Sequence, residues 1–482
     1  MSDDLDPRDW PAFRAASHAA LDRMIDFLER AREGPVWRKA PAEVRQHFQS
    51  PLPRRPREFA EVLEDFETNI KPYGVGNTHP LFMGWVHGAG TPVGMVAEML
   101  AAGLNANCGG RDHIGIEVER QIARWAAELF GFPDGATGLF VTGSSAANFL
   151  GLLVARDAAM GHEIRGAGFF ASGRQLAAYA SAHAHGCVAQ AMELAGIGSA
   201  HLRSIPGDGE GAMRVELLKA AIERDLAAGL SPFLIIGTAG TVDTGAIDPL
   251  QGLARIAKEY RLWLHVDGAF GALAALSDIL KPRLVGLERA DSIAFDFHKW
   301  AHVPYDAGFL LVRDGKMHRG TFAAAAAYLR RASGGLAAGD VWPSDLGPDL
   351  SRGFRALKTW FTFQVHGADK IGRAIEATCE NARYLAERLN GSATFELRAP
   401  VSLNIVCFAL KAGWRDEANE AIVVDLQERG LAAPSTTSLS GRPVIRAAIV
   451  NHRTTAADID QFVLALDEAA ERLGASGRSG AG

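Results

Sequence analysis

A histidine and a lysine stand at the end of an apolar, alternating run in the segment DSIAFDFHKW, residues 291–300. Alternation with a period of two is typical of a strand, so His298 and Lys299 are expected to follow a strand directly. A lysine amine in a dry pocket can form a Schiff base with an aldehyde. The alternative for Lys299 is a surface lysine whose stem lies along Trp300.

A candidate anion site lies in TGSSAAN, residues 142–148, where an apolar run at 138–142 precedes a helix expected to begin near Ser144. The free N–H groups and the dipole of a helix start attract anions, and the hydroxyl groups of Ser144 and Ser145 add two donors. This arrangement suits a phosphate group. An ordinary helix cap is the alternative interpretation.

Asp267 follows a short apolar strand in LHVDGAF, residues 264–270. A carboxylate at that depth needs a cationic or hydrogen-bonding partner, because an isolated buried charge is costly. A protonated heterocyclic nitrogen would be such a partner, whereas a turn aspartate before Gly268 is the alternative. An anion cup, a carboxylate and a lysine on successive strand ends are together what pyridoxal 5′-phosphate requires. The three motifs therefore predict this cofactor, with Lys299 as its covalent anchor.

The 482-residue chain is 48% hydrophobic with a formal net charge of −6, which predicts a globular protein with a large core. It has no long basic or acidic block, so neither a nucleic acid nor a membrane is expected as a partner. The sequence shows no signal-peptide pattern and no apolar run of membrane-spanning length, and its four cysteines are widely separated. We therefore expect a cytoplasmic protein with free thiols and no bound metal.

Apolar periodicity predicts an α/β protein with several parts. A helical arm, a large domain, a small α/β domain and a disordered tail are expected at residues 1–76, 77–365, 366–474 and 475–482. In the arm, one amphipathic helix is expected after an Asp6-Pro7 cap and a second near 57–71. The large domain alternates apolar runs with helical stretches, which is typical of a mainly parallel sheet covered on both faces. Its expected strands are 138–142, 168–172, 201–206, 232–238, 262–268, 292–298 and 308–313.

Seven motifs make the chain resemble the group II pyridoxal-phosphate decarboxylases, the aromatic-L-amino-acid decarboxylase family. The resemblance reaches from the N-terminal helices to about residue 472. It implies the PLP-dependent transferase fold type I of aspartate aminotransferase, with a large seven-stranded sheet domain, a homodimer, and α-decarboxylation of an L-amino acid. The motifs are THPLF at 78–82, TGSSAANFLGLLVAR at 142–156, SAHAH at 181–185, GTAGTVDTGAIDP at 237–249, HVDGAFG at 265–271, DFHKW at 296–300 and FRALKTWF at 354–361.

The resemblance also implies roles for single residues. His185 would stack on the cofactor ring and Ala269 would lie against the opposite face. Tyr328 would sit on a mobile loop that reaches the neighbouring subunit's site and would deliver a proton. His298 would contact the phosphate or the substrate. The implied catalytic residues are Lys299, His185, Tyr328 and Asp267, and the cofactor-binding residues are Ser144, Ser145, His185, Thr241, Asp267, Ala269, His298 and Lys299.

The substrate pocket and part of the cofactor site depart from the family pattern. Asp296 stands where asparagine is common before the His-Lys pair. The segments 85–90 and 104–115 are more polar than in the animal and plant aromatic enzymes, and Ser351 matches a serine frequent in members with phenolic or imidazole substrates. We therefore expect a tyrosine-like, dihydroxyphenylalanine-like or histidine-like substrate. The expected substrate-binding residues are Trp85, His87, Arg111 and Ser351.

Other functions stay open at this point. The substrate could be an acidic or small aliphatic amino acid, and Arg111 could form a local ion pair with Asp112 instead of binding substrate. An aminotransferase or carbon–sulfur lyase on the same fold would need an arginine for the substrate carboxylate, for which Arg446 is the candidate near the C-terminus. A regulatory protein that binds the cofactor without turnover is the non-enzymatic alternative.

Overall fold

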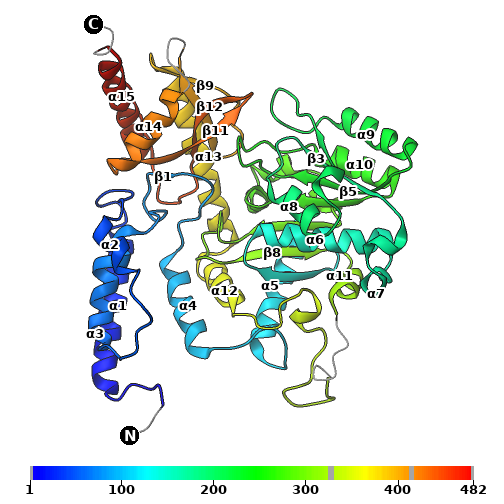
Figure 1. Ribbon diagram of the computed structural model, residues 1–482, viewed down its shortest axis with the longest axis horizontal. Coiled ribbons are helices and arrows are strands. Elements are labelled where there is room, and N and C mark those ends of the chain that lie inside the picture. The colour runs from blue at the N-terminus through cyan, green and yellow to red at the C-terminus, as the bar shows by residue number, and fades with distance from the viewer. Residues whose placement is uncertain (1–3, 324–330, 412–416, 479–482) are drawn as a thin grey trace.

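The computed structural model describes residues 4–323, 331–411 and 417–478, which form two β-sheets and the helices around them (Figure 1). The larger sheet has seven strands in the order β2-β8-β7-β6-β5-β3-β4. Strand β8 runs antiparallel to β2 and β7, and the other neighbours are parallel. The expected mainly parallel seven-stranded sheet is therefore confirmed. Its strands are β2 (Thr137–Val141), β3 (Leu176–Ser181), β4 (Leu202–Ile205), β5 (Ser231–Thr238), β6 (Trp263–Asp267), β7 (Ser292–Asp296) and β8 (Gly308–Val312).

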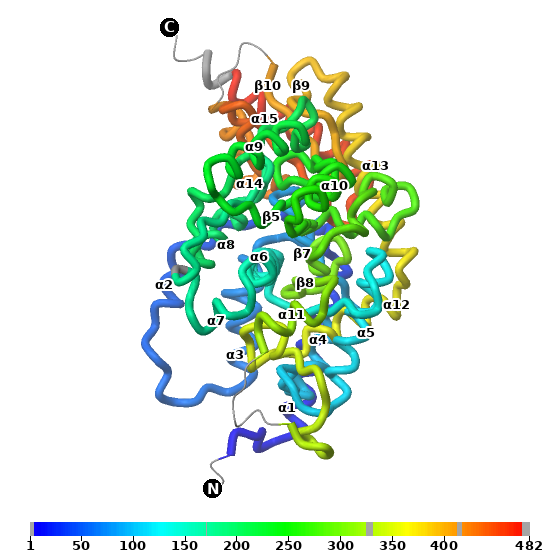
Figure 2. Tube along the Cα trace, turned by 90° about the vertical axis from the view of Figure 1, so that its right-hand side faces the viewer, coloured from blue at the N-terminus to red at the C-terminus, as the bar shows by residue number. Residues whose placement is uncertain are grey.

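Helices cover both faces of this sheet (Figures 1 and 2). Helix α6 (Ser144–Met160) packs on β5 to β8 from one side, while α5 (Ile114–Phe130), α9 (Val215–Ala227) and α10 (Leu250–Tyr260) pack on the other. Successive strand residues therefore join different cores: Leu139 and Val141 belong to the α6 side and Phe140 to the opposite side. Burial on both faces explains why the strands read as continuous apolar runs.

One of the seven expected strands is wrong. Residues 169–172 form a 3-10 turn, and the strand of this region is β3, which starts at Leu176. Gly168 and Gly173 bound the turn with φ angles of +80° and +66°, which no β-strand residue adopts. Strand β3 is rich in alanine, a weak strand former, and every residue in it is buried. Its structure depends on pairing with β4 and β5 rather than on local propensity.

The smaller sheet has the order β1-β11-β12-β10-β9, in which β1 runs parallel to β11 and the others are antiparallel. Helices α13 (Ala368–Asn390) and α14 (Glu417–Glu428) pack on it, and α15 (Ala456–Arg478) packs on them. Helix α15 ends at Arg478, so the first four residues of the expected disordered tail are helical instead. The strands are β1 (Phe82–Met83), β9 (Phe395–Leu397), β10 (Ile405–Leu410), β11 (Ala433–Leu439) and β12 (Arg442–Ala448).

The N-terminal arm lies to one side of the two sheets (Figure 1). It contains α1 (Trp10–Glu29), α2 (Ala42–His47) and α3 (Phe59–Asp65), and none of these helices has a buried residue. Asp9, rather than the expected Asp6, caps α1, because its Oδ1 accepts a hydrogen bond from the Ala12 N–H at 2.9 Å. Among the described helices, none is long and apolar enough to cross a membrane.

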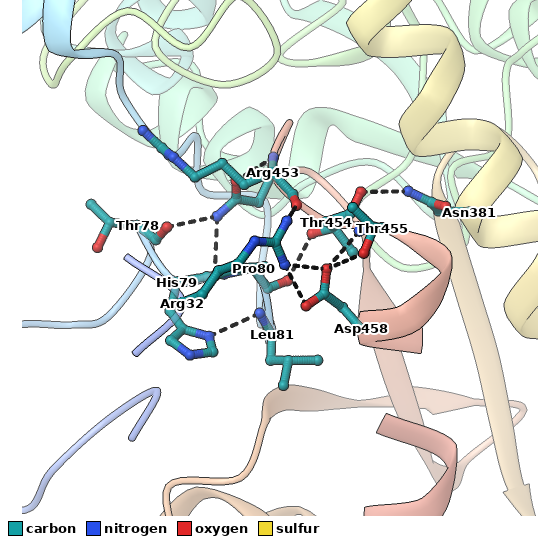
Figure 3. A network of polar contacts seen from close by, with 11 residues as sticks. Arg32, Thr78, His79, Pro80, Leu81, Asn381, Arg453, Thr454, Thr455 and Asp458 are labelled. Carbon is teal, nitrogen blue, oxygen red and sulfur yellow. Dashed lines mark hydrogen bonds and ion pairs between the residues drawn. The ribbon is translucent and has the colours of Figure 1, made fainter. Parts of the chain in front are cut away.

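A polar network ties the arm and the segment just before β1 to the chain that connects β12 with α15 and to the start of α15 (Figure 3). The Asn451 side-chain amide donates to the three carbonyl groups of residues 77–79, at 3.0–3.3 Å. The Arg32 guanidinium contacts the Asp458 carboxylate at 2.6 Å. These contacts fix the chain just before β1, and the segment that follows β1 forms one wall of the site described next.

Candidate active site

A cavity of about 370 Å³ opens where the carboxyl ends of β2, β5, β6 and β7 meet. Ligands in open α/β sheets bind at this edge, because the loops that leave parallel strands converge there. Nine of the residues singled out from the sequence line the cavity, although they are spread over more than two hundred positions. They are Trp85, His87, Ser144, Ser145, His185, Asp267, Ala269, His298 and Lys299.

The start of α6 forms an anion-binding cup at one end of the cavity. Gly143 precedes the helix and no side chain caps its first N–H groups. The Ser144 hydroxyl is buried and has no hydrogen-bond partner among the described residues. A Cβ atom on Gly308 of β8 would lie 2.4 Å from the Gly143 Cα, so glycine is needed there for the strand to pass behind the cup. A helix dipole, free N–H groups and an unsatisfied hydroxyl are together suited to a phosphate.

Asp267 is the last residue of β6 and its side chain is almost completely buried. Its Oδ1 accepts one hydrogen bond, from the Ala269 N–H at 3.1 Å. Burial raises the pKa of the Asp267 carboxyl, while the nearby Lys299 ammonium opposes this effect. The carboxylate therefore still needs a cationic partner, and a protonated ring nitrogen in the cavity would provide one.

Lys299 follows β7 and points its amine into the same cavity, where it meets Asp296. The Lys299 Nζ lies 2.8 Å from Asp296 Oδ2, and the Asp296 side chain is 2% exposed. His298 accepts the Ala307 N–H at its Nδ1 atom, at 3.0 Å, so a neutral His298 carries its proton on Nε2. Burial lowers the pKa of His298 to about 4, which keeps the ring neutral near pH 7.

The wall formed by residues 84–90 carries His87 and is held rigidly. The Asn77 side chain donates to the Gly88 carbonyl at 2.7 Å, and a Cβ atom on Gly88 would lie 1.9 Å from the His298 carbonyl oxygen. The His87 ring stacks on Trp85 with 5.6 Å between centroids. Neither ring nitrogen of His87 has a hydrogen-bond partner among the described residues, and Nδ1 is closed off from solvent. Burial lowers the pKa of His87, so this ring is neutral as well.

Three sequence-predicted residues do not line the cavity of the single chain. Thr241 is buried beneath it, with its hydroxyl 3.1 Å from that of Thr244. The Arg111 guanidinium lies 4.8 Å over the Trp342 ring rather than in an ion pair with Asp112, and its contact with the substrate stays a prediction. Ser351 is exposed on the surface. Tyr328 lies outside the described residues.

Sequence reasoning did not find a buried polar chain behind the cavity wall. His265 of β6 contacts the Asn148 amide oxygen at 2.7 Å through Nε2 and the Ser292 hydroxyl at 2.8 Å through Nδ1. Asn148 in turn lines the cavity and donates to Cys187 Sγ at 3.4 Å. The signal available was a histidine at an inward-facing strand position two residues before Asp267. This chain fixes the wall next to the anion cup.

The described residues fit pyridoxal 5′-phosphate. The cup at α6 suits its phosphate, the under-partnered Asp267 suits its pyridine nitrogen, and the Lys299 amine suits its aldehyde. The fit rests on unsatisfied groups in one cavity: the Ser144 hydroxyl, the Thr238 hydroxyl and Asp296 Oδ1 are all buried without a described partner. Buried polar atoms of this kind are rare unless a ligand or water satisfies them.

Comparisons with known proteins agree with this chemistry. The family model described as "Pyridoxal-dependent decarboxylase conserved domain" matches residues 41–411. An aromatic-L-amino-acid decarboxylase of Bacillus atrophaeus is 31% identical over 477 residues, covering 96% of each chain. A histidine decarboxylase of Drosophila melanogaster is 31% identical over 94% of this chain and 54% of its own length. The crystal structure of an Oryza sativa TDC with PLP and tryptamine has a TM-score of 0.89 at 24% identity, covering 98% of this chain and 100% of that one.

The neutral buried histidines predict a loss of stability in mild acid. Burial lowers the pKa of His265 to about 3 and that of His298 and His318 to about 4, from an ordinary value of 6.5. The unfolded chain therefore takes up protons below pH 6.5 that the folded chain refuses, so stability falls as the pH drops from 6.5 towards 4. We expect His265→Gln to weaken this dependence in denaturant unfolding curves at pH 7, 6 and 5. The partly exposed His201→Gln is the control, and an unchanged slope in His265→Gln would contradict the prediction.

Proposed function

The chain belongs to the pyridoxal-dependent decarboxylase family, and from this premise we propose that it removes the α-carboxyl group of an aromatic or imidazole-bearing L-amino acid. It is a PLP-dependent amino-acid decarboxylase, a carboxy-lyase that releases an amine and CO2. What we propose beyond the reaction type is the class of substrate. Relatives named as aromatic-L-amino-acid, tyrosine and histidine decarboxylases support it.

The geometry of the cavity supports the roles proposed for Lys299, Asp267 and the start of α6, and the family resemblance supplies those of His185 and Tyr328. When bound, pyridoxal phosphate supplies an electron sink for the carbon that loses CO2. Ser144, Ser145 and the start of α6 bind the phosphate. Asp267 holds a proton at the ring nitrogen by charge pairing. The Lys299 amine would hold the cofactor through its aldehyde, and His185, an exposed residue of the lining, would cover the ring. Delivery of a proton to the α-carbon by Tyr328 stays a prediction.

The observation that carries the substrate proposal is the unpartnered imidazole of His87. The His87 ring stacks on Trp85 in the cavity wall. The centroid of the Tyr305 ring lies 6.0 Å from that of His87, in an edge-to-face arrangement. A flat apolar wall favours an aromatic ring, and Nε2 of the neutral imidazole, unlike the enclosed Nδ1, can donate or accept one hydrogen bond. A ring that carries a hydroxyl or an N–H group would satisfy both features. A purely aliphatic side chain would leave the imidazole unpaired, which is costly.

The aminotransferase and lyase alternatives receive less support from Arg446. Its guanidinium is 3% exposed and donates to the Trp85 carbonyl at 3.0 Å and to the Ser435 hydroxyl at 3.2 Å. These contacts place Arg446 behind the wall, and it is not among the residues that line the cavity. The same contacts give it a supporting role for the wall. A decarboxylase of acidic amino acids would need a cation for the second carboxylate, and Lys299 is the only lysine or arginine among the lining residues.

The first experiment measures CO2 and amine release from the twenty common amino acids and dihydroxyphenylalanine with the cofactor-loaded protein. We expect release from tyrosine, dihydroxyphenylalanine or histidine, and none after Lys299→Ala, because the cofactor loses its covalent anchor. Lys299→Ala should also lack the visible absorbance of the lysine-bound cofactor. Release only from acidic or aliphatic substrates would refute the substrate proposal and leave the reaction type intact.

His87 predicts discrimination between substrates that differ by one polar group. With tyrosine as substrate, His87→Leu should lower kcat/KM by about tenfold, the worth of one hydrogen bond, and should leave phenylalanine nearly unaffected. If histidine is the substrate, the same loss is expected for histidine. His87→Gln keeps a donor and an acceptor and serves as the matched control. An equal loss on tyrosine and phenylalanine would mean that His87 acts through packing alone.

We also propose that the protein is a cytoplasmic homodimer assembled through its arm. Helices α1 and α3 pack on each other through Phe13 and Phe59, with 5.0 Å between ring centroids. Their outer faces stay apolar, including Ile25 and Val62, which are 42% and 46% exposed. Exposed large apolar side chains on neighbouring helices are typical of an interface. The four cysteines are free and buried, in keeping with a reducing compartment.

Charges on that face should separate the subunits. We expect the double variant Ile25→Asp, Val62→Asp to elute as a monomer in size-exclusion chromatography with light scattering, because two carboxylates per subunit would be buried in the interface. Leu226→Asp is the control, since Leu226 is also 49% exposed but belongs to α9, a helix on the opposite side of the molecule from α1 and α3 (Figure 1). A dimer in the double variant would exclude this face as the interface.

A further inference from the structure

Asp296 is a buried carboxylate that has no role in the decarboxylation described above. Its Oδ2 pairs with the Lys299 amine at 2.8 Å, but its Oδ1 is buried with no partner among the described residues. That free oxygen lies 3.9 Å from the position that a Cβ on Gly143 would occupy, so it faces the anion cup. An acceptor-only carboxylate therefore stands where the cup should offer donors.

Cofactor binding would worsen this problem if Asp296 stayed charged. The Lys299 amine leaves its ion pair when it condenses with the aldehyde, and a phosphate anion arrives beside the remaining oxygen. Two anions sharing a buried site cannot both stay charged cheaply, and one of them takes up a proton. Phosphate keeps its charge through the N–H groups at the start of α6, whereas Asp296 Oδ1 has no donor of its own.

We propose that Asp296 takes a proton from the Lys299 ammonium when the cofactor binds and keeps it, acting as a neutral hydrogen-bond donor to the phosphate. An N–H bond of the ammonium breaks and an O–H bond forms on Asp296, which leaves Lys299 as a free amine. That amine and the aldehyde then form a C=N bond and release one water. The proton stays within the site, and the charges of Lys299 and Asp296 add up to zero both before and after its transfer.

The surroundings of Asp296 favour this proton position. The titratable side chains that line the cavity with it come from four parts of the wall, and Lys299 is the only lysine or arginine among them. His298 lies 3.7 Å from Asp296 Oδ2 through its Nε2, but burial keeps that ring neutral. The others are Asp267 at the end of β6, His87 on the segment after β1, His185 before α8 (Cys187–Leu194), and Tyr305 after β7.

The first test is an infrared difference spectrum between the cofactor-free and the pyridoxal-phosphate-loaded full chain. We expect the C=O band of a protonated carboxyl to appear on loading, and to be missing in Asp296→Asn. Asp306→Asn is the matched control and should keep the band, because Asp306 also follows β7 but pairs with Arg355 at 2.7 Å instead of Lys299. Loaded wild-type protein without a new carboxyl band would overturn the proposal, even if Asp296→Asn failed to fold.

The second test is cofactor retention as the pH is raised. Once Asp296 loses its proton it repels the phosphate, so the rate of cofactor release from the wild type should rise at least about tenfold relative to Asp296→Asn, whose amide donates at every pH. Release is followed by the visible absorbance remaining after dilution. An identical pH profile in wild type and Asp296→Asn would refute the role of the carboxyl proton.

This inference rests on the assignment of Lys299 as the cofactor anchor, and the two can fail separately. Neither infrared bands nor cofactor release requires turnover, so both can be measured even if no tested amino acid is decarboxylated. If Lys299→Ala kept the absorbance of the lysine-bound cofactor, Lys299 would not be the anchor, and the Asp296 proposal would be overturned as well. A lost absorbance in Lys299→Ala together with an unchanged pH profile in Asp296→Asn would overturn the Asp296 proposal alone.

Discussion

The active site depends on two buried carboxylates at the ends of neighbouring strands. Asp267 ends β6 and Asp296 ends β7, and these strands pair in parallel, so the two side chains must share one edge of the sheet. The Asp296 carboxylate raises the pKa of the Asp267 carboxyl, and the Lys299 ammonium partly offsets that effect. The arrangement is stable only with cations or protons in the cavity. A cofactor with a protonated ring nitrogen and an aldehyde for the lysine fits this requirement.

The rest of the fold serves to keep these groups fixed and dry. Helices on both faces bury the sheet, and the α6 dipole places partial positive charge at the edge where the carboxylates lie. The wall of residues 84–90 closes the cavity from the side of the smaller sheet. It is held by Arg446 of β12 and by contact of Gly88 with the His298 backbone. The smaller sheet therefore contributes to the site by holding the backbone of the wall, and not through side chains that line the cavity.

Local sequence patterns were sufficient where the chemistry follows a strand directly. Asp267, Lys299 and the start of α6 each follow an apolar run. They lie close together because the carboxyl ends of parallel strands share one edge of the sheet. The pattern failed for β3, whose alanine-rich strand is stabilised by its neighbours. It also could not place Thr241 or Arg111. Thr241 contacts Thr244, three residues further on, and Arg111 lies over the ring of the distant Trp342. His185 needed the family resemblance, since an exposed histidine before a short helix carries no local signal.

The charge states of His87 and His298 explain why the charge of Asp296 affects phosphate binding. Burial keeps His87 and His298 neutral, so they offer hydrogen bonds to a ligand but no positive charge. The anion cup therefore depends on the N–H groups of α6 and on hydroxyl groups, with no cationic side chain beside the phosphate other than Lys299 among the described lining residues. With Lys299 bound to the cofactor's aldehyde, as proposed, no side chain would balance the charge of Asp296. An asparagine at this position avoids that imbalance, whereas an aspartate couples phosphate binding to a proton.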